Sequence, residues 1–189
     1  MTSVDEHGWV VGAVAPLPPE RAYSVLVPEP SSVIDAVRWV AQAARFFAAS
    51  LAVEPAKRYP AGGWPRVDRA TVRVGPLAGP PGGGVPRGVV ALCTLPLSDA
   101  PLVRARAAQG VAAMGGAGFD VLLARATRLW QLDAAPLEGE PGAALLVAAL
   151  LASLALGPVL APDGAVLGVK SCRDRLAALG SGRGAAGRR

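Results

Sequence analysis

The most apolar stretch of the chain, GAALLVAALLASLALGP at residues 142–158, carries no charged side chain and constrains the fold more than any other. As a helix, residues 142–156 would span about 22 Å, whereas the hydrocarbon core of a bilayer is about 30 Å thick. Extension to residue 161 supplies the length, but it includes Gly157 and Pro158, which favour the end of a soluble helix. We therefore predict a buried central helix, with a membrane-spanning segment at 142–161 as the alternative.

The composition indicates that this helix needs a partner surface. Hydrophobic residues make up 52% of the 189 residues and charged residues 17%, against about 45–50% and about 25% in typical soluble domains. A helix that is apolar all round needs cover on all sides, which a small monomer supplies only in part. We predict one domain over residues 1–179, working within an oligomer or larger complex, and a disordered basic tail at 180–189.

The pattern of apolar residues and turn signals predicts an α+β domain. Strands are predicted at residues 9–15, 22–27, 69–75, 88–95 and 165–170. Helices are predicted at residues 33–51, 98–114, 119–132, 142–156 and 172–179. The expected architecture is a mostly antiparallel sheet of about five strands with helices packed on one side, and with exposed loops at 54–68 and 76–88.

The helix at 33–51 has the most regular pattern, with Ser31 or Ser32 as its cap. Polar residues, among them Asp35 and Arg38, fall on one face, and apolar residues recur on another at helical spacing. This second face, predicted to pack against the sheet, consists of Val33, Val37, Val40, Ala44, Phe47 and Leu51.

Residue types that support catalysis are sparse. His7 is the only histidine, and no cluster of His, Cys or acidic residues has the spacing of a metal site. Cys172 lies among Lys170, Arg173 and Arg175, whose charges would lower its pKa and make it a nucleophile. We expect no cofactor and no catalytic residue, and we keep a small enzyme of unknown class, using Cys172, as one alternative.

The remaining cysteine, Cys93, falls within a predicted apolar strand and is expected in the core. Two cysteines do not form a disulfide framework. The N-terminal residues lack the basic region of a signal peptide. An intracellular protein with reduced thiols is the expectation.

The strongest polar feature is the segment KRYPAGGWPRVDRATVR at residues 57–73. The chain has a net charge of +5, and this segment combines cations with aromatic rings. Single-stranded nucleic acid is bound by such a mixture, because cations attract phosphates and rings stack on bases. An acidic protein partner and a solvated loop are the other interpretations. The candidate binding residues are Lys57, Arg58, Tyr59, Trp64, Arg66, Arg69 and Arg73.

These observations favour a non-catalytic assembly, scaffold or accessory subunit that acts through protein–protein association or self-association. The alternatives are a nucleic-acid-binding module centred on residues 57–73 and the small enzyme described above. Contact with a membrane is the least favoured of the partner classes.

Overall fold

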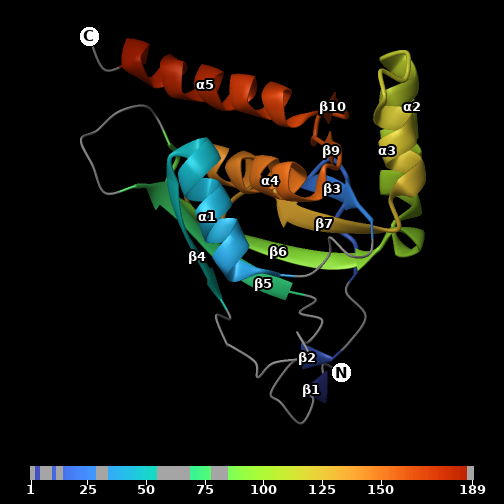
Figure 1. Cartoon of the computed structure of the whole chain (residues 1–189), viewed down its shortest axis with the longest axis horizontal. Coiled ribbons are helices and arrows are strands. Elements are labelled where there is room, and N and C mark those ends of the chain that lie inside the picture. Colours follow the sequence, from blue (N-terminus) through green and yellow to red (C-terminus); the bar gives the residue numbers. More distant parts are fainter. Residues whose placement is uncertain are drawn as a thin grey trace.

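A computed structural model describes residues 3–4, 10–11, 15–28, 34–54, 69–77 and 85–186 of the chain. Within these residues the fold is α+β, with five α-helices and one eight-stranded sheet in which the recorded strand pairs are antiparallel (Figure 1). Two further strands, β1 (Ser3–Val4) and β2 (Val10–Val11), pair only with each other. The α+β class is confirmed, although the sheet has more strands than the five expected.

The large sheet has its two edges at β10 and β4, and its longest strands, β6 and β5, lie towards the β4 edge. A short strand, β8 (Glu138–Gly139), pairs with β6 beside this main path. Buried residues alternate with exposed or half-buried ones along β5, as the sequence predicts, whereas β3 and β7 are buried on both faces. In order across the sheet, the strands are β10 (Val166–Leu167), β9 (Val159–Leu160), β3 (Ala22–Val27), β7 (Arg128–Asp133), β6 (Gly88–Pro96), β5 (Arg69–Pro76) and β4 (Ala49–Glu54).

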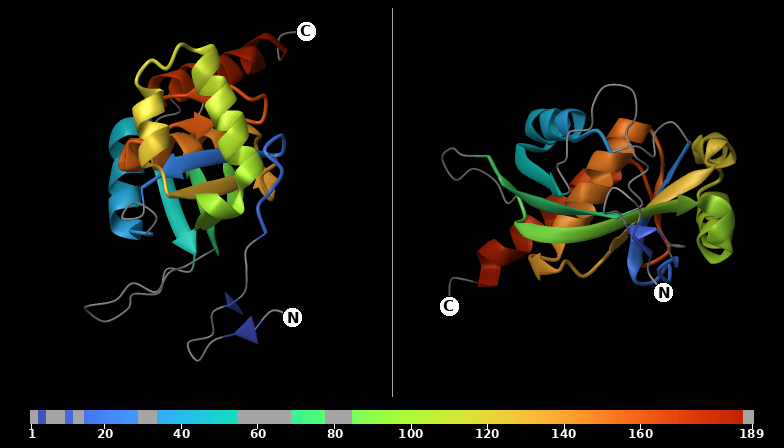
Figure 2. Two further views of the ribbon diagram at one scale, coloured as in Figure 1. Left: turned by 90° about the vertical axis from the view of Figure 1, so that its right-hand side faces the viewer. Right: turned by 90° about the horizontal axis from the view of Figure 1, so that it is seen from below.

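Helices cover both faces of the sheet, so the expectation that they pack on one side is wrong (Figure 2). On one face α1 and α4 share a core with the strands, and α5 packs against α4 as an outer layer. On the other face α2 and α3 cover a second core at the β3–β7–β9 end. The helices are α1 (Ala36–Phe47), α2 (Pro101–Ala113), α3 (Phe119–Arg125), α4 (Gly142–Ala155) and α5 (Val169–Ala186).

The apolar run at 142–158 forms helix α4, and each residue from Gly142 to Ala152 is buried. Strands β3, β6 and β7 contact α4 from the sheet, while α1 and α5 contact it from other sides. The protein itself therefore supplies the cover that the sequence led us to seek from a partner. Among the described residues, no helix combines the length and the apolar character that a bilayer crossing requires.

Two strands, β7 and β4, were not predicted because the pattern of their residues favours a helix. Within the segment predicted as a helix at 119–132, α3 ends at Arg125 and β7 begins at Arg128. Because β7 is buried on both faces, it lacks the alternation of polar and apolar residues that marks a strand. The predicted helix at 33–51 ends at Phe47, because Ala48 adopts a left-handed conformation (φ 51°) and turns the chain into β4.

Helix α1 also presents a different face from the one predicted. Trp39 and Ala43 are its buried residues, and the Trp39 ring meets the Trp130 ring of β7 edge to face, with centroids 5.5 Å apart. Val37 and Val40, predicted to pack against the sheet, are 74% and 41% exposed. The large Trp39 ring decides the orientation, since its burial removes more apolar surface from water than either valine would.

Two predicted helix ends also differ from the structure: the N-terminal end of α1 and the C-terminal end of α5. Asp35 is the N-cap of α1 and accepts a hydrogen bond from the backbone N–H of Arg38 at 3.0 Å, whereas Ser31 and Ser32 lie outside the described residues. Helix α5 continues to Ala186, beyond residue 179, where the basic tail was expected to begin.

Candidate functional site

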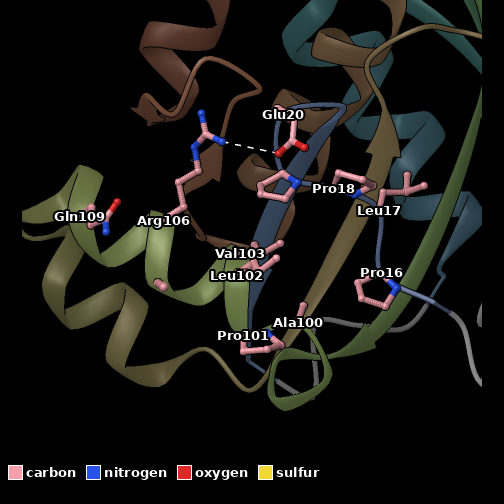
Figure 3. A pocket seen from close by; sticks show the side chains of 12 residues that line it. Pro16, Leu17, Pro18, Glu20, Ala100, Pro101, Leu102, Val103, Arg106 and Gln109 are labelled. Carbon is pink, nitrogen blue, oxygen red and sulfur yellow. Dashed lines mark ion pairs between the residues drawn. The ribbon is translucent and has the colours of Figure 1, made fainter.

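A hollow of about 920 Å³ lies between residues 16–20, here called the proline segment, and the first half of α2 (Figure 3). We name this hollow the proline groove. Its volume is within the range of about 300–1,000 Å³ that is typical of ligand sites. The lining residues are Pro16, Leu17, Pro18, Pro19, Glu20, Ala100, Pro101, Leu102, Val103, Ala105, Arg106 and Gln109.

The proline segment is fixed to the sheet by one buried side chain. The carboxamide of Gln131 in β7 accepts a hydrogen bond from the Leu17 N–H at 2.8 Å and donates one to the Leu17 carbonyl at 3.1 Å. A turn bond from the Arg21 N–H to the Pro18 carbonyl, at 2.9 Å, holds the other end. Prolines also restrict their own backbone, so this wall of the groove is preorganised.

The opposite wall is the N-terminal half of α2. Val103 and Ala107 are buried against the sheet, which anchors the helix. Leu102, in contrast, is 72% exposed and lines the groove. A large exposed leucine on an anchored helix offers an apolar contact to a binding partner without any rearrangement of the fold.

The polar groups of the groove gather at one end. The Arg106 Nη1 atom lies 3.7 Å from the Glu20 Oε2 atom, and Arg106 Nη2 donates a hydrogen bond to the Pro162 carbonyl at 3.4 Å (Figure 3). A guanidinium carries five donors, so Arg106 retains donors for an incoming acidic group. Together with the exposed Gln109, it gives the groove one polar and one apolar end.

The chemistry of this lining supports binding rather than catalysis. None of the twelve residues is a Cys, His, Ser, Thr, Lys or Asp, and the two ionised side chains form an ion pair with each other. Nucleophilic catalysis needs an activated nucleophile beside a base. The proline groove therefore supplies apolar contact and an anion contact.

Of the predicted binding residues, Arg69 and Arg73 lie on β5, both exposed and both on the face opposite the buried Ala70 and Val72. Lys57, Arg58, Tyr59, Trp64 and Arg66 lie outside the described residues. The structure therefore places two of the seven.

A second hollow, of about 540 Å³, brings Arg73 together with Arg87, which the sequence analysis did not select. Ser50 and Glu138 also line it, so one carboxylate accompanies the two cations. The signal for Arg87 was its position just before β6, because β5 and β6 pair with Arg73 opposite Val89.

The hypothesis that Cys172 is a nucleophile is wrong. Its side chain is fully buried in the core under α5, and this burial raises the pKa of the thiol to about 11, while nearby Arg175 acts in the opposite direction. Cys93, expected in the core, is half-buried on the other face of the sheet. His7 lies outside the described residues. A neutral, inaccessible thiol does not attack a substrate.

Neither a metal site nor a relative narrows the function. Within the described ranges, no three His, Cys, Asp or Glu side chains group closely enough to hold a metal ion. Comparisons of the chain with models of protein families, with curated proteins and with solved structures found no significant match. The features that bear on function are therefore the proline groove and the surface of the sheet.

The sequence analysis treated residues 16–20 only as a turn-forming connector. Two signals were nevertheless present: Leu17 has a proline on each side, and Leu102 follows Pro101 at the start of a helix. Prolines and an apolar residue at an element boundary favour a rigid, partly exposed surface. What the sequence lacks is any indication that these two distant segments face each other.

Proposed function

We propose that this protein is a non-catalytic accessory subunit that associates with a partner protein through the proline groove. The observation that carries the proposal is the combination of two anchored walls with an exposed apolar residue, Leu102, on one of them. Binding surfaces that are already ordered lose little conformational entropy on association, which favours affinity.

The polarity of the groove indicates the chemistry of the bound segment. Pro16, Pro18 and Leu102 supply exposed apolar surface that suits a large aliphatic or aromatic side chain. Arg106 at the other end suits a carboxylate, which would share or replace its ion pair with Glu20. We infer a partner segment in which an apolar residue lies next to an acidic one, and the net charge of +5 favours its approach.

A defined apolar anion provides the first test. The dye 8-anilinonaphthalene-1-sulfonate has the chemistry inferred for the groove, and its fluorescence rises when it leaves water. Leu102→Asp is expected to weaken dye binding about 10-fold or more, equivalent to about 1.4 kcal/mol. The matched control is Val121→Asp on α3, a residue 57% exposed and outside the groove.

A photo-crosslinking amino acid at position 102, compared with the same group at position 121, then identifies the partner in cells. The proposal is supported if position 102 alone captures one peptide segment, if that synthetic segment binds the purified protein, and if Leu102→Asp removes the binding. Equal labelling at both positions, or a segment that binds the Leu102→Asp variant as well as wild type, contradicts it.

A second candidate function, nucleic-acid binding, is favoured by the position of Arg69 and Arg73 on one exposed face of β5. Cations on one sheet face are suited to a phosphate backbone, and their contribution depends on salt. A labelled single-stranded 20-mer, titrated at several salt concentrations, tests this candidate. The variant Arg69→Ala/Arg73→Ala should reduce both the affinity and the salt slope, whereas salt-independent binding or no binding rejects it.

A further inference from the structure

Helix α1 leaves half of its apolar surface uncovered. Val37, Val40, Ala41 and Ala44, here called the α1 flank, recur at the spacing that places residues on one side of a helix. Val37 and Val40 are 74% and 41% exposed, Ala41 is exposed and Ala44 is half-buried. An exposed row of this kind indicates an interaction surface.

The α1 flank lies on the side of the helix that faces away from α4. On the other side of the helix, Arg38 Nη2 donates to the Leu154 carbonyl at 3.4 Å, and Gln42 Nε2 donates to the Ser153 Oγ atom at 3.1 Å. The polar side of α1 therefore faces α4. Helix α1 contacts β4, the last strand at this edge of the sheet (Figure 1).

Strand β4, which follows α1 in the chain and contacts it, has one backbone edge that no described strand covers. A hydrogen bond from the Leu77 N–H to the Ala48 carbonyl, at 3.3 Å, fixes the phase of the β4–β5 ladder. In an antiparallel ladder the phase alternates, so Ala49, Leu51 and Val53 turn their N–H and C=O groups outward. Among the described residues, no strand pairs with this side of β4. An edge without an internal proline or lysine is open to another strand.

We propose that two copies of this chain form a two-fold symmetric dimer in which β4 pairs with β4 and α1 packs against α1. The occupant of the edge is a second copy because both surfaces are self-complementary about one axis. This interface is separate from the proline groove, so the dimer does not rest on the proposed function.

The backbone edge pairs with itself when the two-fold axis passes through Leu51. The outward groups of Leu51 then meet those of Leu51 in the second copy, and Ala49 meets Val53. On the open face of the sheet, Ser50 lies opposite Ala52 of the second copy. No two like charges are brought opposite each other, which removes a common obstacle to edge pairing.

The α1 flank is complementary to itself in side-chain size. In an antiparallel pair centred between Val40 and Ala41, each Val37 lies opposite an Ala44 and each Val40 opposite an Ala41. A large side chain therefore faces a small one at every step, as close helix packing requires.

One axis serves both pairings. From Ala48, which joins α1 to β4, the strand centre at Leu51 lies about 10 Å along β4 at ~3.3 Å per residue. The centre of the α1 flank lies about 11 Å back along α1 at ~1.5 Å per residue. Because these distances agree, the same two-fold rotation brings both the strands and the helices together.

Complementary charged variants test the dimer by sedimentation velocity. Val40→Glu and Ala41→Lys each place two charges in the α1 interface, so each chain alone is expected to sediment as a monomer. An equimolar mixture is expected to recover a dimer of the two variants, because position 40 of one copy lies opposite position 41 of the other. Recovery in the mixture also shows that both variants are folded.

The control is Val121→Glu, an exposed residue of α3 far from the interface, which should sediment as the wild type does. The proposal is overturned if the wild type is monomeric at about 100 μM, if either single variant still forms a dimer, or if the mixture stays monomeric. Dye binding to the proline groove is measured on the same samples, so failure of the dimer and failure of the proposed function are distinguished.

Discussion

Gln131 and Leu17 are joined by two hydrogen bonds, of 2.8 and 3.1 Å, although they lie far apart in the sequence. The side-chain amide of Gln131 takes the place that a neighbouring strand's backbone would occupy beside Leu17. Its Nε2 atom also donates to the Ser24 hydroxyl at 3.2 Å. One buried side chain therefore connects a wall of the proline groove to two central strands.

Gln131→Leu removes all three of these bonds while it keeps a side chain of similar size. We expect the free energy of unfolding to fall by about 1–3 kcal/mol, because buried polar groups of Leu17 and Ser24 lose their partner. Dye binding to the proline groove should weaken as well, since its wall is no longer anchored. Urea unfolding followed by circular dichroism, together with the dye titration, measures both effects.

Ser24→Ala is the matched control, because it removes only the 3.2 Å bond and leaves both bonds to Leu17. Its expected cost is smaller, about 1 kcal/mol or less, and dye binding should stay as in wild type. If Gln131→Leu and Ser24→Ala behave alike, the link between the sheet and the groove wall is unimportant.

The end of α4 at Gly157 was predicted correctly, but the structure gives a different reason for the glycine. The left-handed residue at the end of α4 is Leu156 (φ 54°), not the glycine. A Cβ atom on residue 157 would collide with the carbonyl oxygen of Leu26. The glycine is therefore needed for close approach to β3, and the Leu26 N–H of β3 donates a hydrogen bond to the Pro158 carbonyl at 3.0 Å.

Gly157→Ala should lower the free energy of unfolding by about 1–3 kcal/mol, since the backbone of β3 must move to admit the methyl group. Gly75→Ala is the comparison, because a Cβ there meets only Ser50 Oγ at 3.7 Å and Arg87 Cγ at 3.8 Å. The urea midpoints of both variants measure the loss of stability. An equal effect of the two substitutions would show that the contact with Leu26 carries no cost.

Much of the fold could be predicted where one physical signal dominates. The alternation of Arg69, Thr71 and Arg73 with buried residues identifies β5, and the uncharged run at 142–158 identifies α4. Strand β7 was missed because it is buried on both faces, and the face of α1 was mistaken because apolar residues extend over more than half of its surface. Spacing alone does not say which half of such a helix is covered.

The proline groove could not be predicted from the sequence, for a related reason. Its walls come from the proline segment and from α2, which are distant in the sequence and are joined by tertiary contacts such as the ion pair of Arg106 with Glu20. No local pattern records such a pairing. The exposed arginines of β5, in contrast, were found because strand alternation is a local signal.

Leu156→Gly is expected to stabilise the protein. Leu156 is 75% exposed, so its side chain contributes little packing, yet its left-handed backbone costs a residue with a Cβ about 1–2 kcal/mol. After the added entropy of glycine in the unfolded chain, a gain of about 0.5–1 kcal/mol remains. Leu156→Ala removes the same side chain but keeps the backbone cost, so only the glycine variant should melt at a higher temperature.

Cys172 makes stability depend on pH in the alkaline range. Burial raises the pKa of its thiol from 9.0 to about 11 in the folded protein, so the unfolded chain loses this proton at a lower pH. The contribution of the neutral thiol is therefore fully present below pH 9 and is lost as the pH rises towards 11. The free energy of unfolding should fall over that interval more steeply in wild type than in Cys172→Ala.

Urea unfolding at pH 8, 9.5 and 10.5 measures this difference, and Cys93→Ala serves as the control because Cys93 is only half-buried. All other ionisable groups are common to the wild type and Cys172→Ala, so subtraction removes their contribution. The Cys93→Ala protein should follow wild type, whereas Cys172→Ala should have the flatter profile. Parallel profiles for wild type and Cys172→Ala would mean that the folded protein does not hold this thiol in a desolvated site.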